Sequence, residues 1–424
     1  MKVAEEYKDT KIGRIPKDWE VVKLGETCEF YRGQPFAKSE IDENGIHECI
    51  HYGELFTVYS EIIRTIHSKT NSEVIRASKF GDVLMPSSDV TPIGLATASV
   101  INKDGVLIGG DVNIIRPILK LNSNYLSYLI NHEKKKIIRL ISGTNVKHIY
   151  NRNIKTLLYA LPPLSEQQKI AEILSTVDEQ ISTTQAIIDK SKELKKGLMQ
   201  KLFSEGIGHT EFKDTKIGRI PKDWKVAMLK DVAKVITSGF SFDVFEKSKL
   251  DSGVEVLFTK VSDMNLKGNE RIISDSVNKG FFADDFVSSN SVLKPNSLIF
   301  PKRGAAIKTN KKRINEKHII LDPNLIAVSF DEKGKVNYLF TYYYFISFDL
   351  MRIVEDGTIP QLNKRDIEPF KIPLPSIEEQ QKIADILSEA DAKIEKEEQE
   401  KAQLEQLKKG LMQQLLTGQK RVKV

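Results

Sequence analysis

Duplication is the feature that most constrains how this chain can fold. A twelve-residue segment, KDTKIGRIPKDW, stands at Lys8–Trp19 and again, unchanged, at Lys213–Trp224, 205 positions later. Two further pairs of blocks repeat at a spacing of 213 positions: LPPLSEQQKIAEIL (161–174) with LPSIEEQQKIADIL (374–387), and LKKGLMQKL (194–202) with LKKGLMQQL (407–415). A period above 200 residues is a domain duplication and not a solenoid repeat. The chain is therefore expected to fold as two copies of one architecture.

The regions between the repeated blocks differ almost throughout, and short echoes survive in them. The echoes are GDVLMPSS (81–88) with NSLIFPKR (296–303), DVNII (111–115) with DPNLI (322–326), and SGTNVKHIYNRNI (142–154) with DGTIPQLNKRDI (356–367). Alternating segments such as VEVLFTKV (254–261) predict strands, whereas NYLSYLINHEKKKIIRLI (124–141) has the spacing of a helix. These patterns predict two similar globular α+β domains that present different surfaces.

The later repeated blocks predict two long helices. Ser165 and Ser376 each follow prolines and open a Ser-x-x-Gln/Glu pattern, which is typical of a helix N-cap. Helices are expected over 166–204 and 377–417. Two equal helices in a duplicated chain would most simply run antiparallel, which gives the molecule an internal pseudo-twofold axis.

The apolar spacing within these helices predicts a coiled coil. From Ile170 to Leu202 and from Ile383 to Leu415, apolar residues recur about every 3.5 positions. Polar residues interrupt the seam at Thr184, Ser191 and Lys195 and at Glu397, Lys401 and Lys408. Gly197 and Gly410 fall inside the pattern and cost about 1 kcal/mol each relative to alanine. A close helix crossing at these glycines would explain them.

The repeats divide the chain into four parts. A first globular domain is expected at 1–160, a first long helix at 161–206, a second globular domain at 207–373 and a C-terminal long helix at 374–424. The length of 424 residues is enough for two or more cores.

Composition excludes several classes of protein. The sequence contains no apolar run long enough to span a membrane and no signal peptide at its start, so a cytoplasmic protein is expected. Cys28 and Cys49 are the only cysteines, which excludes a disulfide framework and a Cys-rich zinc module. His47 and His51 would share one face of a helix beside Cys49, but the glycines around them favour a strand or loop over a metal site.

Motifs of catalysis are missing. The chain has no phosphate-binding loop G-x-x-x-x-G-K-[ST], no H-E-x-x-H, no C-x-x-C and no G-x-S-x-G. It also lacks the tetrapeptide Asn/Asp-Pro-Pro-Tyr/Phe that marks enzymes methylating amino groups of DNA bases. A chain without catalysis, cofactor or metal is expected.

Basic and polar clusters in the two divergent regions are the candidate DNA-binding residues. Lysine and arginine neutralise phosphates, arginine reads guanine and glutamine reads adenine. The net charge of +6 does not by itself decide whether the chain binds DNA. For each cluster the alternative is a solvated surface with no ligand. The candidates are Tyr31, Arg32, Gln34, Ser87, Ser88, Asp89, Thr91, Lys147, His148 and Arg152 in the first region, and Ser241, Lys302, Arg303, Lys308, Lys311, Lys312, Arg313, Lys364 and Arg365 in the second.

The layout as a whole resembles the specificity (S) subunit of type I restriction-modification systems. The resemblance rests on the duplicated I-P-x-x-W openings at Ile15–Trp19 and Ile220–Trp224 and on the duplicated P-x-x-E-Q-Q-K-I-A joints that begin the helices, and it covers nearly the whole chain. It implies two target recognition domains that read a bipartite, asymmetric sequence in double-stranded DNA across a gap set by the length of the spacer helices.

The resemblance also implies partners. Two modification subunits would bind S-adenosylmethionine and methylate adenine, and restriction subunits would use ATP and magnesium. Identical framing segments would offer equal docking surfaces to the two modification subunits, although packing of Ile15, Pro16 and Trp19 against a helix would also explain the repeat. The competing hypotheses are an enzyme that methylates or cuts DNA itself and a coiled-coil interaction protein with no role on DNA.

Overall fold

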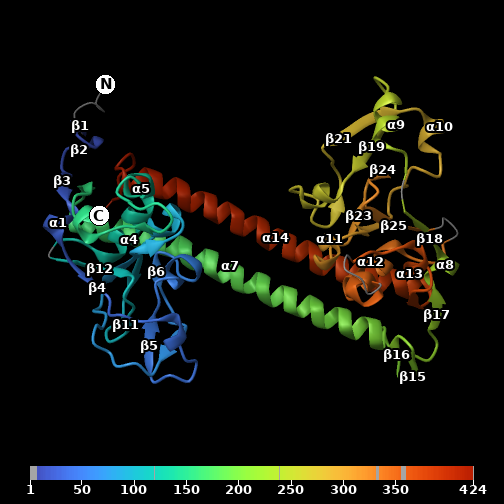
Figure 1. The fold of residues 1–424 in the computed structure, drawn as a ribbon, viewed down its shortest axis with the longest axis horizontal. Coiled ribbons are helices and arrows are strands. Elements are labelled where there is room, and N and C mark those ends of the chain that lie inside the picture. The colour runs from blue at the N-terminus through green and yellow to red at the C-terminus, as the bar shows by residue number, and fades with distance from the viewer. Residues whose placement is uncertain (1–6, 119, 238, 331–333, 355–359, 424) are drawn as a thin grey trace. The chain divides into compact units, whose positions relative to one another are not determined.

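The computed structural model describes residues 7–118, 120–237, 239–330, 334–354 and 360–423 (Figure 1). The chain divides into two compact units. Unit 1 comprises Met1–Ala186 with Glu398–Val424, and unit 2 comprises Ile187–Glu397. Each unit therefore contains one globular domain, the first half of the long helix that follows it and the second half of the other long helix. The domain boundaries inferred from the repeats stay a prediction, because the compact units divide both helices.

The two identical twelve-residue segments fold identically. They form the hairpins β1 (Tyr7–Thr10) with β2 (Gly13–Pro16), and β15 (Phe212–Thr215) with β16 (Gly218–Pro221). Gly13 and Gly218 have φ angles of 110° and 108°, which residues with a Cβ rarely adopt. The next strand of each copy closes the domain, since β3 (Glu20–Lys23) pairs with β14 (Leu158–Leu161) and β17 (Lys225–Met228) pairs with β26 (Lys371–Leu374).

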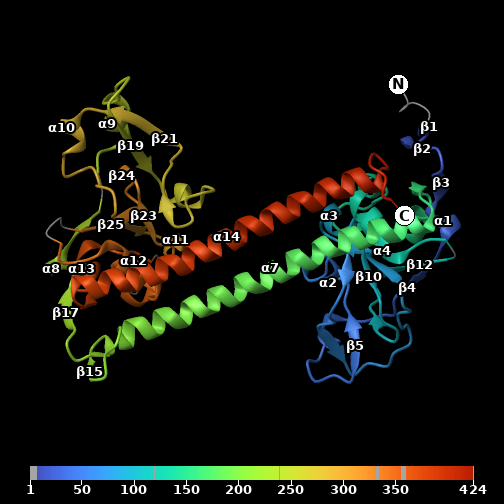
Figure 2. The same ribbon diagram turned by 180° about the vertical axis from the view of Figure 1, so that it is seen from behind.

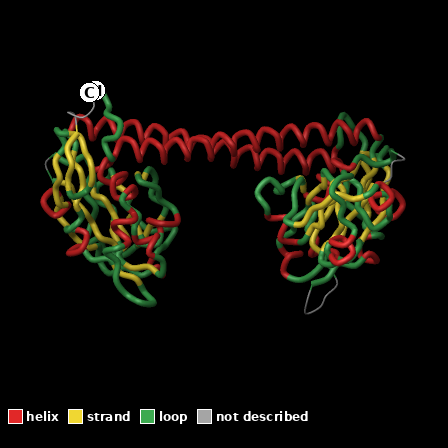
Figure 3. Tube along the Cα trace, turned by 90° about the horizontal axis from the view of Figure 1, so that it is seen from above, coloured by secondary structure: helices red, strands yellow, loops and turns green. Residues whose placement is uncertain are grey.

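Each globular domain contains a five-stranded sheet and a three-stranded sheet in equivalent orders, surrounded by short helices and loops (Figure 3). In unit 1 the five strands are, in spatial order, β4 (Cys28–Arg32), β12 (Val112–Pro117), β8 (Asp82–Pro86), β10 (Ser99–Ile101) and β6 (Ile62–Ile63). In unit 2 they are β18 (Ala233–Ile236), β25 (Leu325–Phe330), β22 (Leu298–Pro301), β23 (Arg313–Asn315) and β20 (Ile272–Ile273). The three-stranded sheets are β11 (Leu107–Ile108), β5 (His47–Ile50) and β7 (Ser68–Thr70), and β21 (Asn278–Phe282), β19 (Val254–Thr259) and β24 (His318–Leu321).

Short helices complete each domain. In unit 1 they are α1 (Leu24–Thr27), α2 (Glu54–Thr57), α3 (Pro92–Leu95), α4 (Ser123–His132), α5 (Lys134–Ile138) and α6 (Asn151–Ile154). In unit 2 they are α8 (Leu229–Val232), α9 (Phe242–Lys247), α10 (Asp284–Val287), α11 (Ala305–Lys308), α12 (Tyr338–Ile346) and α13 (Lys364–Ile367). The prediction of two α+β domains with one fold is confirmed, and His47 and Cys49 lie in a strand, as the flanking glycines indicated.

The long helices are α7 (Leu164–Glu205, 42 residues) and α14 (Ile377–Leu416, 40 residues), within two residues of the predicted bounds. Ser376 caps α14, since the Glu379 amide donates to its Oγ at 3.3 Å. The capping prediction for Ser165 is wrong, because α7 begins one residue earlier and Ser165 lies inside it. The repeat spacing places Pro163 where the second copy has Ser376.

Within each unit the two helix segments run antiparallel, as predicted. In unit 1 Lys408, late in α14, pairs with Asp178, early in α7, and in unit 2 Lys195, late in α7, pairs with Asp391, early in α14. The helices also share the cores of the domains: Leu174 of α7 and Leu415 of α14 belong to the apolar cluster that contains Leu126 of α4. Figure 2 shows the start of α7 and the end of α14 beside the first domain. The contacts thus repeat between the units as internal symmetry requires.

The explanation offered for the helix glycines is wrong. A Cβ built on Gly197 or on Gly410 would meet no atom within 4 Å in the part of the chain that the structure describes. Among the described residues, no close helix crossing exists at either glycine to offset its low helix propensity.

The thiols of Cys28 and Cys49 are both buried. The described residues contain no helix that is long and apolar enough to cross a membrane.

Candidate DNA-binding surfaces

Each domain is attached to the start of its own long helix by a buried tryptophan. Trp19 Nε1 donates to Glu166 Oε2 at 2.9 Å, and Trp224 Nε1 donates to Glu379 Oε2 at the same distance. The amino end of a helix favours such a carboxylate. The packing explanation for the repeated segment is therefore confirmed at this residue.

The side chains that contact the two carboxylates differ. Arg421 donates from Nε to Glu166 at 2.8 Å, and its other nitrogens reach Asp18, so these carboxylates raise the pKa of the guanidinium above its ordinary value. In unit 2 the imidazole of His209 lies 2.9 Å from Glu379 instead. Identical segments are thus held by different chain ends or linkers.

A second equivalent cluster binds each domain to both helix segments. In unit 1 Tyr128 donates its hydroxyl proton to Asp178 at 2.5 Å, and Lys408 Nζ lies 2.7 Å from the same carboxylate. Glu61 is the third charged partner, 2.5 Å from Lys408. Burial favours the neutral amine, but the attraction of Glu61 and Asp178 outweighs it and raises the pKa of Lys408.

Unit 2 repeats this cluster with one change of charge. Tyr343 donates to Asp391 at 2.8 Å, and Lys195 pairs with the same carboxylate. The third partner is Arg271, whose guanidinium lies 3.6 Å from Asp391 and 3.4 Å from Glu395. Position 61 and position 271 are equivalent, because each precedes the short strand that pairs in parallel with the next strand of its sheet. A cation thus replaces an anion.

In unit 1 three of the segments selected from the sequence lie together. Strands β9 (Ser88–Asp89) and β13 (Lys147–His148) pair antiparallel, and we call them the ribbon of unit 1. The Arg32 guanidinium donates to Ser87 Oγ at 3.3 Å, just before β9. The side chain of Asn151, just after β13, donates to the backbone oxygen of Tyr31 at 3.0 Å. Residues from three distant parts of the sequence therefore form one surface.

A stacked group continues the ribbon. Ser88 Oγ and His148 Nδ1 share a hydrogen bond of 2.9 Å, and the His148 ring lies 6.0 Å from the ring of Tyr150 with 19° between their planes. The Arg152 guanidinium lies 5.1 Å from the centre of the Tyr150 ring, a cation–π distance. Sequence reasoning missed Tyr150, although its place in the basic run KHIYNR was a signal.

Other candidates of unit 1 are occupied by local structure. Gln34 is 7% exposed, and its amide bonds the backbone of Glu73, Ile75 and Arg76, so its prediction as a base reader is not supported. The same holds for Ser87, which is 2% exposed. The remaining candidates have local partners as well: Tyr31 donates to Glu29, Asp89 accepts from Thr91, Thr91 caps α3, and Lys147 donates to Gly143.

In unit 2 the equivalent surface is more basic. Arg303 forms an isolated antiparallel bridge with Gln361, at the positions where Ser88 pairs with His148 in unit 1. The backbone oxygen of Lys302 accepts from the Leu362 amide at 2.9 Å. Arg303 is exposed, as are Lys364 and Arg365, which begin α13. Four predicted residues therefore gather, and Gln361 joins them; residues 356–359 of the echo used to select this region lie outside the described ranges.

The basic run 311–313 bonds the protein itself. Lys312 is 1% exposed and donates to the Phe348 backbone oxygen at 2.6 Å, and burial lowers its pKa to about 8. Arg313 Nε donates to the backbone oxygen of Asn269 at 2.7 Å, and Lys311 bonds the side chain of Asn265. These residues hold a loop in place. The predicted DNA contact is not supported at the buried Lys312, and it stays a prediction at the partly exposed Lys311 and Arg313.

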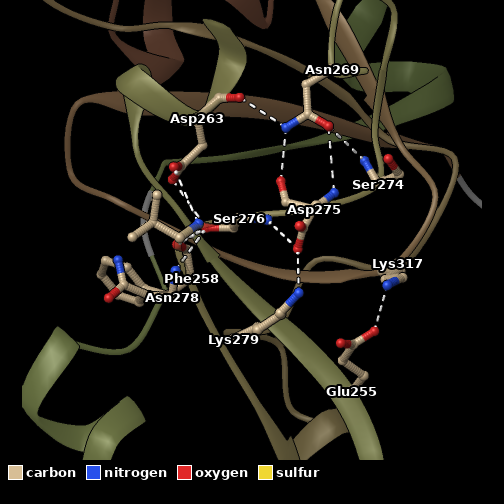
Figure 4. A network of polar contacts seen from close by, with 11 residues as sticks. Glu255, Phe258, Asp263, Asn269, Ser274, Asp275, Ser276, Asn278, Lys279 and Lys317 are labelled. Carbon is tan, nitrogen blue, oxygen red and sulfur yellow. Dashed lines mark hydrogen bonds and ion pairs between the residues drawn. The ribbon is translucent and has the colours of Figure 1, made fainter. Parts of the chain in front are cut away.

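That loop is fixed by the polar network in Figure 4. Asp263, 1% exposed, accepts from the Lys260 amide at 2.7 Å and from Ser276 Oγ at 3.0 Å, and Asn269 donates to its backbone oxygen. Unit 1 uses Glu54 in the same way, accepting from the His51 amide and from Ser68. The divergent regions therefore share an internal frame that their sequences do not reveal.

The remaining candidates of unit 2, Ser241 and Lys308, form no side-chain hydrogen bond or ion pair in the described residues with the group around Arg303 and Gln361. Ser241 caps α9, and Lys308 is exposed at the end of α11. A cavity of about 580 Å³ also lies along β18, where Lys230, Lys234, Lys294 and Lys335 contribute to its walls. The positions equivalent to Lys230 and Lys234 in unit 1 are Gly25 and Glu29, so these two lysines belong to unit 2 alone, whereas Lys79 stands where unit 2 has Lys294. Within the described ranges no group of His, Cys, Asp or Glu could hold a metal ion.

Comparison with known proteins agrees with the duplicated architecture. The model of the protein family described as "Type I restriction modification DNA specificity domain" matches residues 16–193 and again residues 221–406. The specificity subunits named for the MjaX and MjaVIII type I restriction enzymes of Methanocaldococcus jannaschii are 31% and 30% identical to the chain, over 99% of it and 97% of each relative. The solved S subunit of a type I restriction-modification system from M. genitalium has the same fold, with a TM-score of 0.60 at 15% identity over 98% of both chains. The chain therefore belongs to the family of type I restriction-modification DNA specificity subunits.

Proposed function

We propose that this chain reads a bipartite, asymmetric DNA sequence with one half-site for each unit, docks two modification subunits and has no catalytic activity of its own. The observation that carries the proposal is the contrast between identical frames and different ribbons. The hairpins, the tryptophan–glutamate bonds and the helix clusters repeat, whereas Ser88 and His148 are replaced by Arg303 and Gln361. Equal frames suit two copies of one partner, and unequal ribbons suit two different half-sites.

The exposed faces of the long helices support the docking part of the proposal. Leu194 and Leu407 are 64% and 50% exposed and lie one turn before Gly197 and Gly410. A glycine with no neighbour allows another backbone to approach closely. Because both copies expose the leucine and the glycine of the same LKKGLMQ sequence, a partner helix would find the same surface twice.

The cofactors of the reaction belong to the partners in this proposal. The modification subunits would supply S-adenosylmethionine and transfer its methyl group to adenine, and the restriction subunits would use ATP with magnesium. This chain would supply position on the DNA.

Methylome sequencing tests the proposal. The chain is expressed with its modification subunit in a host without other adenine methylation, and a host that expresses the modification subunit alone is the control. Methylated adenines in one two-part, asymmetric motif are expected. A complex that assembles but adds no methylation would support the coiled-coil interaction protein, and methylation by the purified chain alone with S-adenosylmethionine would support the enzyme hypothesis.

The spacer part of the proposal has its own test. One heptad inserted after Ile181 and one after Ile394 lengthen both helices by about 10 Å each, at about 1.5 Å per residue. The unread gap of the methylated motif is expected to lengthen. An active complex with an unchanged gap would contradict the role of helix length.

A further inference from the structure

Two valines adjoin one end of the ribbon of unit 1. Asp89 pairs with Lys147 and Ser88 pairs with His148. Val90 directly follows Asp89, the last residue of β9, and Val146 directly precedes Lys147, the first residue of β13. Because Asp89 and Lys147 are partners, the two valines leave the ribbon at the same end. The end of the ribbon therefore has an apolar tip.

This tip is exposed to solvent. Val90 is 70% exposed and Val146 is 48% exposed, and Ile93 of the adjoining helix α3 is 67% exposed. Tyr150, stacked on His148, is 37% exposed. Exposed apolar side chains beside a binding site lower the free energy of binding only if the ligand covers them with apolar groups of its own.

Cations lie along the ribbon. Lys147 is paired with Asp89 next to the tip, Arg152 lies over Tyr150, and Arg32 donates to Ser87 just before β9. A matching ligand carries negative charge around isolated apolar groups. The major groove of DNA has this character, since phosphates line its edges and the C5-methyl group of thymine projects into it, and its width admits a two-stranded ribbon.

We propose that Val90 and Val146 read thymine through its C5-methyl group in the half-site of unit 1. The proposal rests on the proposed function, because it assigns a base and a chemistry to a surface inferred to bind DNA. The equivalent face of unit 2 carries Arg303 and Gln361, with Gly304 and Ala305 following Arg303 where Asp89 and Val90 follow Ser88. Methyl readout at the tip is therefore a property of unit 1.

The experiment removes one methyl group at a time from the DNA. The target sequence is taken from the methylome, each thymine is replaced in turn by deoxyuridine, and the binding of the complex with the modification subunits is measured at fixed salt. Losing one buried methyl contact is expected to weaken binding about threefold to fivefold. The effect is expected at one or two thymines, all in one half-site.

Variants connect the effect to the tip. In the double variant Val90→Ala with Val146→Ala, thymine and deoxyuridine at those positions are expected to bind equally well. Val58→Ala is the matched control, because Val58 is a valine of unit 1 that is 50% exposed at the end of α2 and belongs to neither strand of the ribbon. The control is expected to keep the full sensitivity to deoxyuridine.

The outcomes separate this proposal from the proposed function. Sequence-specific binding with no sensitivity to deoxyuridine would overturn methyl readout and leave the specificity role intact. Sensitivity that persists in the double variant would assign the methyl contact to other residues and overturn the role of the two valines. An assembled complex with no sequence-specific binding would overturn the proposed function itself.

Discussion

The two units use one frame to present opposite chemistries at their ribbons. In unit 1 Ser88 and His148 pair beside exposed valines, and in unit 2 Arg303 and Gln361 take the same places among lysines and arginines. The charge at the helix cluster also changes sign, from Glu61 to Arg271. A duplicated frame therefore tolerates exchange of its surface. Its hydrogen bonds come from the backbone, from the repeated blocks and from side chains that keep the same chemistry at equivalent positions, as Tyr128 and Tyr343 do.

The largest expected difference between the units is at the helix clusters. Lys408→Met leaves Glu61 and Asp178 close together without the lysine that they share, at an expected cost of about 3–5 kcal/mol to unit 1. Lys195→Met leaves Asp391 with Arg271, so the cost to unit 2 is expected to be about 1–2 kcal/mol.

Urea denaturation followed by tryptophan fluorescence measures these costs. Trp19 reports unit 1 and Trp224 reports unit 2, and changing the other tryptophan to phenylalanine isolates each signal. Lys409→Met, at an exposed position of α14, is the control. Equal losses in the two units would contradict the compensating role of Arg271.

The next effect concerns the bridge of Arg303 with Gln361 in unit 2, which stands where unit 1 has its ribbon. Arg303→Lys keeps the charge but loses the paired donors that read guanine, so discrimination at one base position is expected to fall by about 1–3 kcal/mol. Lys364→Ala is expected to weaken binding equally at all sequences and to reduce its salt dependence. Competition binding over single-base variants of the target measures both, and a uniform effect of Arg303→Lys would mean that it contacts phosphate.

The units are also expected to respond oppositely to alkaline pH. Burial lowers the pKa of Lys312 to about 8, so the unfolded state binds this proton more tightly and unit 2 gains stability as the pH rises from 8 toward the ordinary lysine value of 10.5. In unit 1 burial raises the pKa of Cys28 and Cys49 to about 12, so their contribution to stability is lost as the pH rises above 9.0.

The size of this effect is at most about 1.4 kcal/mol per pH unit for each group. Denaturation midpoints of the two single-tryptophan proteins between pH 8 and 10.5 are expected to diverge. Lys312→Met should remove the gain in unit 2. Parallel curves for the two units would contradict the buried, depressed lysine.

The smallest effect concerns the feature that the units share most closely. Gly197→Ala and Gly410→Ala are each expected to stabilise the free chain by about 1 kcal/mol, because alanine favours the helix and nothing crowds the new methyl group. The same changes are expected to weaken binding of the modification subunits, measured by titration calorimetry. Unchanged affinity would remove these glycines from the docking surface.

Much of the architecture was readable from the sequence, and the errors have physical causes. The echo of DVNII in DPNLI suggested that these letters align, but the strands pair differently: Val112 lies opposite Pro86 and Leu325 lies opposite Pro301, two residues away from the alignment of letters. Strand register depends on which side chains enter the core, and short letter matches do not report it. The turns before β8 and β22 show the opposite case, in which different letters take the same conformation. Gly81 and Asn296 are different residues, and both have a positive φ.

The sequence by itself determined the duplication, the long helices, the α+β domains and the family, because repeated blocks and helical periodicity are local patterns. The tertiary structure decided which candidates could face DNA. Gln34, Lys312 and Arg313 are polar or charged in the sequence and are used inside the fold, whereas Tyr150 and Gln361 are placed at the ribbons. Whether a polar side chain forms hydrogen bonds with the protein's own backbone or is free to bond a ligand depends on which strands lie next to it. Long-range strand pairing sets those neighbours.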